Sequence, residues 1–357
     1  MSTAIAEQRL RNQCLTRTGF SRAADVVEWL GAVQAQEYEH AKWALGLRMR
    51  EGTVGADIER AFEEGRILRT HLMRPTWHFV TPADIRWLTE LTAPRVHRVM
   101  APYDRRLELD TGLLVRGTAL IEAALGDRHY LTRAELGERL SREGLTFDGV
   151  RLAHLAMYAE LEGVICSGPR RGKQFTYALV AERAPGASRL SRDEALATLT
   201  RRYFASHGPA TVRDFVWWSG LSTADARRGL DMNKARREDV GRRTYWTIGG
   251  PRRGAMRDHL VHLLPIYDEY IVAYRDREAV PHGPPTISRH ADSVIFQHTL
   301  VIAGHVAGTW RRMQTSKPVA IDVIPLRRLT RPERHALGEA AGRYEQFLGV
   351  PVSFSSR

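Results

Sequence analysis

Two glutamines separated by a single residue, Gln34 and Gln36, are the strongest candidates for chemistry in this sequence. A glutamine side chain offers an acceptor and a donor group and does not titrate, so it can position a water molecule but is a poor general base. Two such amides suit a hydrolysis whose leaving group is already activated. A Gln-x-Gln string is also common as polar decoration of a surface, and the string alone leaves that alternative open.

Both amides can serve one site only if the backbone that carries them is extended. In a helix, residues i and i+2 lie about 200° apart, whereas in a strand they lie on the same side. The apolar spacing of residues 23–30 predicts a helix, and Gly31 is the residue type that commonly ends one. We therefore expect Gln34 and Gln36 to project together from an extended segment, with Glu37 pointing the other way.

A second candidate group alternates along a β-rich stretch, where Arg74, Thr76 and His78 fall on every other position. In a strand this spacing places all three side chains on one face. Such a face could clamp a phosphate or support a catalytic group. It could equally be the polar outer face of a half-buried strand, and the residues alone do not decide between these two interpretations.

Asp268 and Glu269 form a carboxylate pair beside Tyr270, in what we interpret as a loop. Such a pair could help catalysis, but neighbouring carboxylates in a turn are ordinary. His259 and His262 lack the acidic partner of a metal-binding string, and the glycine-rich stretch 249–254 lacks the lysine and hydroxyl of a phosphate loop. We therefore expect no metal and no cofactor.

The charge of the chain favours a polyanionic partner. Basic residues number 53 against 41 acidic ones, giving a net charge of +12, and only four of the basic residues are lysines. Arginine suits bidentate contacts to phosphates and base edges, so nucleic acid or an acidic membrane surface is indicated. A coding bias that inflates arginine throughout the chain is the alternative explanation.

The remaining composition points to a cytoplasmic protein that acts at the nucleoid. No apolar segment near the N-terminus resembles a secretion signal, and no stretch approaches 18 uninterrupted apolar residues, so we expect no membrane association. The only cysteines, Cys14 and Cys166, lie far apart, which excludes a disulfide framework and fits a reducing compartment.

The elements that position these residues follow a repeated order, seen most clearly in residues 111–187. Helices are predicted over 118–125, from Thr132 with Glu135 completing a capping box, and over 150–162. Strands over 164–167 and 174–179 follow, which is the order of a winged helix. Their connection carries basic residues that we expect to lie against phosphates, namely Arg170, Arg171 and Lys173.

Residues 188–250 repeat this order, with helix starts at Ser191, Thr211 and Ser222 and a wing strand over 245–248. Residues 1–110 form a first winged-helix unit that carries Gln34 and Gln36. Its predicted elements are helices over 23–30 and 56–68, a strand or hairpin over 70–80, and a helix that Thr81 opens.

Residues 251–357 differ from the rest and predict a small β-rich domain, with a barrel as one arrangement, plus a terminal helix from Arg331 to Phe347. The expected strands cover residues 262–266, 294–296, 300–303, 306–310 and 319–324, and residues 277–292 form a long loop. The fold class is therefore α+β and mainly α, with tandem winged-helix (helix-turn-helix) units and a β-rich C-terminal domain.

Four stretches, in this order and on this charge, resemble the winged-helix DNA glycosylases of the AlkZ/YcaQ family. They are Gly31 to Gln36, Arg74 to His78, Leu263 to Tyr270 and Gly304 to Arg312. The resemblance covers nearly the whole chain and implies that the tandem winged-helix units form a concave DNA-binding surface. It also implies a monofunctional enzyme that removes N7-alkylated purines, interstrand crosslinks included, from double-stranded DNA. One branch of that family carries Gln-x-Gln, as this chain does, and some of its members protect producers of DNA-alkylating natural products.

This resemblance implies that Gln34 and Gln36 hold the attacking water at C1′ of a base that is already a cationic leaving group. Candidates for supporting roles are Arg74, Thr76, His78, Asp268 and Tyr270. Expected DNA contacts are Arg170, Arg171, Lys173, Arg252, Arg253, Arg311 and Arg312. We expect a monomer with an open site and no deep, base-sized aromatic pocket beside Gln34, because a crosslinked base cannot readily rotate out of the duplex.

Three other functions remain compatible with the sequence: a non-enzymatic winged-helix regulator, a glycosylase for simple monoadducts only, and an RNA-binding protein. Sequence-specific binding without base release would favour the regulator. Formation of abasic sites in alkylated DNA would favour the enzyme.

Overall fold

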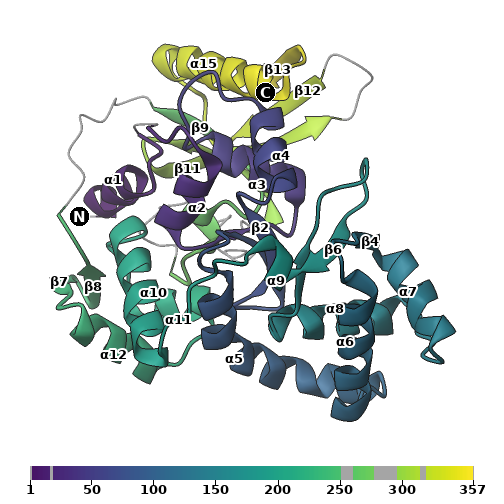
Figure 1. The fold of residues 1–357 in the computed structure, drawn as a ribbon. Helices are drawn as coiled ribbons and strands as arrows, with labels where there is room; N and C mark the ends of the chain where they lie inside the picture. Colours follow the sequence, from purple (N-terminus) through teal and green to yellow (C-terminus); the bar gives the residue numbers. More distant parts are fainter. Residues whose placement is uncertain (1, 17–18, 251–259, 277–295, 314–318, 357) are drawn as a thin grey trace.

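Three segments of the chain share one order of elements: a helix, a very short strand, two further helices and a β-hairpin (Figure 1). In the computed structural model, the described residues are 2–16, 19–250, 260–276, 296–313 and 319–356. The first segment contains α2 (Ala23–Leu30), β1 (Val33–Gln34), α3 (Tyr38–Gly46), α4 (Gly55–Glu63), β2 (Leu68–Leu72) and β3 (Thr76–Val80). Its three antiparallel strands are ordered β1-β3-β2, so the short strand of this winged helix pairs with its hairpin.

The second and third segments repeat this plan. The second contains α6 (Thr111–Leu125), β4 (Leu131–Thr132), α7 (Arg133–Arg142), α8 (Gly149–Leu161), β5 (Ile165–Ser167) and β6 (Thr176–Leu179), with strand order β4-β6-β5. The third contains α10 (Arg192–Ser206), α11 (Val212–Ser219), α12 (Thr223–Met232), β7 (Arg236–Val240) and β8 (Arg243–Thr247). Here the short strand is reduced to a bridge between Ala210 and Trp246. The expected tandem winged helices are therefore confirmed.

Local capping determines where most of these helices begin. Thr132, Ser191, Thr211 and Ser222 each accept a hydrogen bond from the backbone N–H three residues on, and an acidic side chain at that position returns the bond. This reciprocal arrangement satisfies two N–H groups that a helix start would otherwise leave unpaired. The predicted starts of these four helices are confirmed.

Other predicted boundaries in the first unit were wrong. The helix expected over 56–68 ends at Glu63, because Gly65 adopts a φ of 74° and turns the chain into β2. The helix expected from Thr81 begins later: Thr81 and Asp84 close a turn, and α5 (Ile85–Arg106) starts after it. Two short helices and an N-terminal one were not predicted, namely α3, α9 (Val180–Arg183) and α1 (Ser2–Asn12).

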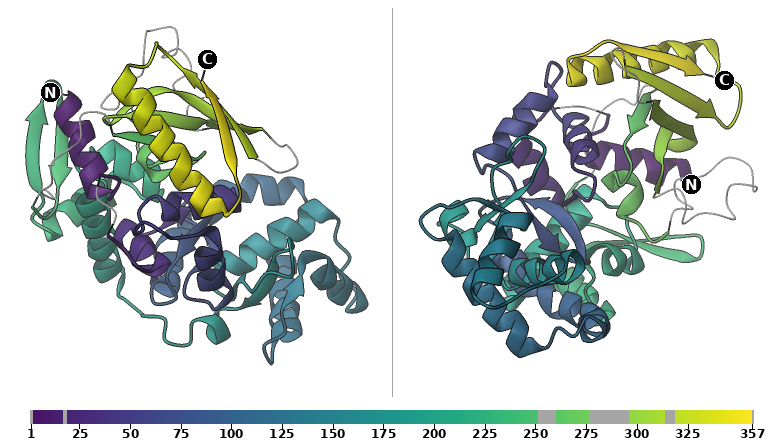
Figure 2. Two further views of the ribbon diagram at one scale, coloured as in Figure 1. Left: turned by 90° about the horizontal axis from the view of Figure 1, so that it is seen from above. Right: turned by 90° about the vertical axis from the view of Figure 1, so that its right-hand side faces the viewer.

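The C-terminal region is an open, curled sheet rather than a barrel. Among the described residues its strands are β9 (Val261–Leu264), β10 (His298–Ile302), β11 (His305–Met313), β12 (Val319–Pro325) and β13 (Val352–Ser356). Within the described ranges, the hydrogen-bonded order β13-β12-β11-β10-β9 leaves β13 and β9 as the two edges of the sheet. Strand β13 was not predicted; it pairs in parallel with β12 after α15 (Arg331–Leu348), which lies across the sheet (Figure 2).

Two further predictions for this region fall at or beyond the limits of the described residues. The strand expected over 294–296 is not formed at Phe296, and its first two residues lie outside the described residues. The long loop expected over 277–292 also lies outside them. The short helix α13 (Glu269–Val272) occupies the place where a loop was expected around Asp268 and Glu269, so that prediction was wrong.

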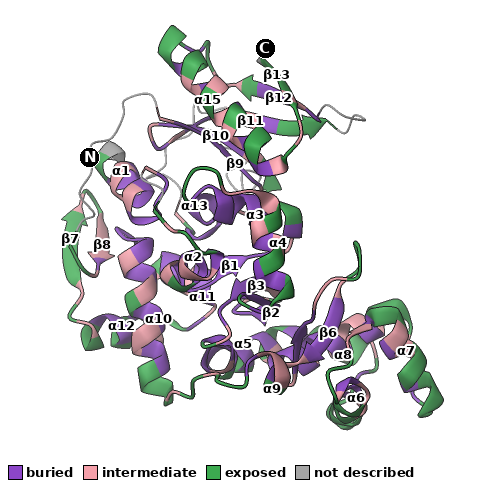
Figure 3. Ribbon diagram, turned by 45° about the horizontal axis from the view of Figure 1, so that its top comes forward, coloured by how far each residue is buried: buried purple, intermediate pink, exposed green. Residues whose placement is uncertain are grey.

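The first unit packs between the C-terminal sheet and the third unit. One hydrophobic core joins α2, α3 and α4 to the C-terminal sheet and α15, and the Trp43 indole donates a hydrogen bond to the Leu263 carbonyl at 2.8 Å. A second core joins the β2–β3 hairpin and α5 to α10, α11 and α12. Strands β1, β2 and β3 consequently lie buried in the middle of the molecule (Figure 3).

In the described part of the chain, no helix combines the length and the apolar character that crossing a membrane requires.

Candidate active site

Gln34 lies where α2 has ended and the chain runs into the central sheet. Gly31 closes α2 with a φ of 87°, which a residue with a side chain rarely adopts. Gln34 then pairs with His78 of β3, and the Ala35 N–H donates to the Trp77 carbonyl at 2.7 Å. The backbone at Gln34 is therefore extended, as the chemistry of two cooperating amides requires. Gln36 is half-buried and Glu37 is exposed.

The hairpin β2–β3 fixes the orientation of both amides. The Arg74 guanidinium donates to the Gln34 Oε1 at 2.8 Å, and the Trp77 N–H donates to the Gln36 Oε1 at 3.4 Å. An arginine only donates, so its partner on Gln34 must be the carbonyl oxygen. Each carbonyl oxygen has a second lone pair, which leaves both amides able to accept a hydrogen bond from a water molecule.

Arg74 reaches Gln34 from the tip of the hairpin, not from a strand. The tip consists of Met73, Arg74 and Pro75, with Met73 in the left-handed region at a φ of 60°. The prediction that strand alternation aligns Arg74 with Thr76 and His78 is therefore wrong for Arg74, because the chain turns there. The guanidinium lies 5.5 Å from the centre of the Trp217 ring, so α11 also borders this tip.

His78 lies directly opposite Gln34 and is completely buried. Its Nδ1 lies 3.0 Å from the Thr76 carbonyl, which accepts the hydrogen bond, and its Nε2 has no hydrogen-bond partner among the described residues. Burial, and next the nearby Arg74 cation, lower the pKa of His78 to about 3. A neutral, enclosed imidazole cannot clamp a phosphate, so His78 can only support the site from beneath. The Thr76 hydroxyl is likewise buried.

Glu269 is the residue of this region that sequence reasoning undervalued. Its carboxylate is 1% exposed; one oxygen accepts the Gln34 N–H at 2.8 Å and the other accepts the Trp218 indole N–H at 2.9 Å. The Nε2 of His207 lies 3.5 Å from the second oxygen. This carboxylate therefore holds the backbone of Gln34 from behind.

Glu269 is ionised at neutral pH despite its burial. Burial by itself raises the pKa of Glu269, but the interaction with His207 and the hydrogen bond from the Gln34 N–H outweigh that effect and bring the pKa below its ordinary value. Burial in turn lowers the pKa of His207, which keeps this imidazole neutral. The result is a fixed negative charge directly behind the paired amides.

The two other candidates in this stretch have structural positions. Asp268 caps α13 and receives two hydrogen bonds from the Arg48 guanidinium, at 2.8 and 2.9 Å, with both side chains buried. The Tyr270 hydroxyl donates to the Gly304 carbonyl at 2.8 Å and ties α13 to the C-terminal sheet. Both residues thus hold the helix on which Glu269 is placed, and neither forms a hydrogen bond with Gln34 or Gln36 in the structure described here.

Arg69, which was not predicted, supports the residue between the two glutamines. Its guanidinium donates to the Ala35 carbonyl at 3.0 Å and is enclosed by the rings of Trp77 and Phe175, at 4.3 and 4.4 Å from their centres. Burial lowers the pKa of Arg69 to about 10, which still leaves it charged. Arg69 lies on β2, where nothing in the sequence separates it from the many other arginines.

The predicted DNA contacts differ in how far they are engaged within the protein. Arg170 is 11% exposed and pairs with Glu39 and Glu59, so the second hairpin tip rests against α3 and α4 of the first unit. Arg171 pairs with Glu135 at 2.6 Å, and Arg311 pairs with Asp322 at 2.9 Å. Lys173 and Arg312 are exposed, and Arg252 and Arg253 lie outside the described residues.

An aromatic cavity of about 380 Å³ lies on the other side of the hairpin. Trp77 lines it, and neighbouring side chains on a strand point to opposite faces, so it opens away from the face that His78 shares with Gln34. Gln34 is not part of its lining. Within the same described ranges, no three potential ligand side chains gather as they would around a metal ion.

Comparisons with known proteins agree on one family. Residues 27–347 match the family model described as DNA glycosylase AlkZ-like. The interstrand DNA cross-link repair glycosylase of Streptomyces sahachiroi is 24% identical over 333 residues, which cover 85% of each protein. The solved structure of the Streptomyces sahachiroi DNA glycosylase AlkZ matches with a TM-score of 0.79 and 22% identity, covering 99% of both chains. At that identity the structural match shows a shared fold.

Proposed function

The chain belongs to the AlkZ-like DNA glycosylases, and we propose that it hydrolyses the N-glycosidic bond of cationic N7-alkylated purines in double-stranded DNA. One observation carries this proposal: Gln34 and Gln36 are both held by hydrogen bonds to their carbonyl oxygens from the same hairpin. Two fixed, non-titrating amides can orient a water molecule but cannot protonate a leaving base. A base that already carries a positive charge needs no such protonation.

The chemistry of such a base matches this arrangement. The C1′–N9 bond breaks, its electron pair neutralises the cationic purine, and the sugar passes through an oxocarbenium-like transition state. Water then forms the new bond to C1′ and releases its proton to solvent. Gln34 and Gln36 hold that water by the free lone pairs of their carbonyl oxygens, which is positioning and electrostatic catalysis.

Glu269 completes this site as a positioning residue. Its hydrogen bond fixes the Gln34 backbone, and its buried negative charge favours positive charge on the sugar in the transition state. Arg74 acts through Gln34 by setting the orientation of the amide. His78 and Thr76 lie beneath the pair, and Asp268 and Tyr270 hold α13.

We propose that the substrates include bulky adducts and interstrand crosslinks. The relative from Streptomyces sahachiroi, which matches over 85% of this chain, carries crosslink repair in its name. General alkylation repair and protection of a producer from its own DNA-alkylating compound would both use this chemistry. Lys173, Arg171, Arg311 and Arg312 are the proposed phosphate contacts among the described candidates, and the protein acts as a monomer.

Excision from defined duplexes tests the proposal. Purified protein is incubated with duplex carrying N7-methylguanine or a nitrogen-mustard crosslink, and abasic sites are counted under single-turnover conditions. We expect Gln34→Ala and Gln36→Ala each to slow release by about 10² to 10³, the usual effect of removing one preorganised polar group. Gln346→Ala, an exposed glutamine on α15, is the matched control and should leave the rate unchanged.

Two results would contradict the proposal. Wild-type protein that forms no abasic sites in N7-methylguanine duplex would exclude this substrate class. A double Gln34→Ala/Gln36→Ala variant with the wild-type rate would exclude the assigned mechanism.

A further inference from the structure

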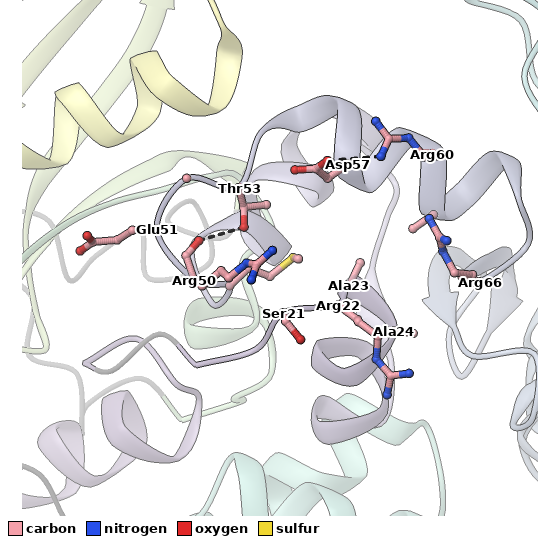
Figure 4. A pocket seen from close by; sticks show the side chains of 13 residues that line it. Ser21, Arg22, Ala23, Ala24, Arg50, Glu51, Thr53, Asp57, Arg60 and Arg66 are labelled. Carbon is pink, nitrogen blue, oxygen red and sulfur yellow. Dashed lines mark hydrogen bonds and ion pairs between the residues drawn. The ribbon is translucent and has the colours of Figure 1, made fainter.

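An open pocket of about 640 Å³ lies at the opposite end of α2 from Gln34 (Figure 4). The start of α2, the chain from Met49 to Thr53, and α4 surround it, so it belongs to the first winged-helix unit. Its lining includes four arginines and two carboxylates: Arg22, Arg50, Arg60, Arg66, Glu51 and Asp57. Positive charge therefore exceeds negative charge in this pocket.

The four guanidinium groups are available to a ligand. All four arginines are exposed. Arg22 pairs with Asp25, Arg66 pairs with Glu64, and Arg60 lies 3.8 Å from Asp57. Exposed pairs of this kind contribute little to stability, so a DNA phosphodiester, whose two free oxygens share one negative charge, can exchange for them at small cost.

The backbone at the start of α2 adds to this preference for an anion. Arg22 occupies the cap position in extended backbone, but its side chain makes no capping hydrogen bond. Ser21, Ala23 and Ala24 line the same pocket, so the first turn of the helix faces it. The start of a helix carries partial positive charge and N–H groups without helical partners, which favours phosphate.

We propose that this arginine pocket binds a phosphate of the DNA backbone away from the lesion. The eight residues of α2 span about 12 Å and separate this pocket from Gln34, so the phosphate would lie away from the base held there. Helix α4, which carries Arg60, is the third helix of its unit, the position that enters DNA in helix-turn-helix proteins. The inference rests on DNA as the substrate polymer, not on the identity of the lesion.

Salt-dependent binding of the full chain to undamaged duplex tests this inference. Affinity is measured between about 50 mM and about 200 mM salt for wild type and for Arg60→Gln/Arg66→Gln. We expect the slope of log affinity against log salt to become shallower by about 0.9 for one lost phosphate contact. Asp57→Asn, which removes a carboxylate from the pocket, should bind more tightly than wild type.

A matched control separates this pocket from general charge. Arg328→Gln/Arg331→Gln removes the same charge from two exposed arginines outside the pocket and should keep the wild-type slope. The inference is overturned if the pocket variant keeps the wild-type slope, or if both double variants lose the same amount.

Inorganic phosphate distinguishes a site for a phosphate of the DNA backbone from a site for free phosphate. If it raises the melting temperature of wild type but not of the pocket variant, while both have the same DNA slope, the pocket takes free phosphate and the DNA assignment is wrong. Because the duplex is undamaged, the result does not depend on excision: a protein that released no alkylpurine could still show the expected slopes.

Discussion

Replacing Glu269 with glutamine removes the negative charge behind the paired amides and nearly preserves the shape of the side chain. The carboxylate lies 2.8 Å from the Gln34 nitrogen, and the bonds of a glutamine place its amide oxygen about 5 Å further on. The positive charge develops on the sugar, beyond the water that the amide holds, so it lies about 12 Å from the carboxylate. At that separation and an effective dielectric constant of about 20, two unit charges interact by about 1.4 kcal/mol. If that stabilisation is realised only in the transition state, Glu269→Gln should slow excision about tenfold.

Single-turnover release of N7-methylguanine measures this effect, and DNA affinity is measured in parallel. We expect the rate to fall while the dissociation constant for damaged duplex stays unchanged. The wild-type rate should also be flat between about pH 5 and about pH 8, because the lowered pKa of Glu269 keeps it ionised there and its charge is lost only in more acidic solution.

The neighbouring carboxylate provides a contrast. Asp268→Asn leaves the buried Arg48 without its charged partner, and breaking such a pair costs about 3 to 5 kcal/mol of stability. This variant should melt at lower temperature, with excision by the folded fraction little changed. The reasoning about Glu269 is refuted if a folded Glu269→Gln protein excises within about threefold of wild type, or if it loses affinity for damaged duplex and keeps its rate.

Two further predictions follow from the hairpin. Gly220 ends α11 at a φ of 71°, and a Cβ there would lie 2.4 Å from the Met73 carbonyl oxygen. Gly220→Ala should therefore lower the free energy of unfolding by about 1 to 2 kcal/mol or more. It should also slow excision, because the added carbon displaces the hairpin tip that carries Arg74. Gly349→Ala is the control, because Gly349 has a φ of 66° but open space around the added carbon, so this variant should lose stability and keep its excision rate. Urea unfolding measures the stability of both variants, and single-turnover excision measures their rates. Equal excision rates for the two variants would contradict the role given to the hairpin tip. Burial lowers the pKa of His78 to about 3 from an ordinary value of 6.5. Between these two pH values the imidazole is protonated in the unfolded chain but not in the folded protein. The free energy of unfolding should therefore fall as the pH drops from about 6.5 to about 3, by up to about 1.4 kcal/mol per pH unit. His78→Asn should show a smaller slope in pH-dependent urea unfolding, and an identical slope would show that His78 is not buried as a neutral group.

Local sequence decided much of the framework. Thr132, Ser191, Thr211 and Ser222 begin helices as predicted, because each capping box is complete within four consecutive residues. The end of α2 at Gly31 and the extended backbone at Gln34 follow from the same local rules. The order of helices and hairpins, read from such signals, was sufficient to predict the winged-helix fold.

The missed elements are those that tertiary packing determines. Nearly every residue of α3 is buried, including Lys42 and Trp43, so its sequence lacks the alternation of apolar and polar faces that reveals a surface helix. Strand β13 forms because α15 carries the chain back beside β12, a pairing between residues that are distant in sequence. The pattern of apolar and polar residues also does not predict the curvature of the C-terminal sheet or its open edges.

The glutamine pair shows the same division. The sequence by itself predicts that Gln34 and Gln36 face the same way, since two residues on extended backbone need only their own spacing for that. The structure confirms the extended backbone at Gln34, where β1 ends, and places Gln36 in a bend beyond it. What orients them comes from elsewhere: Arg74 lies 40 positions away, and Glu269 lies 235 positions away. Only folding brings a buried carboxylate from α13 behind β1, and only there can its charge, shielded from water, favour a cationic transition state.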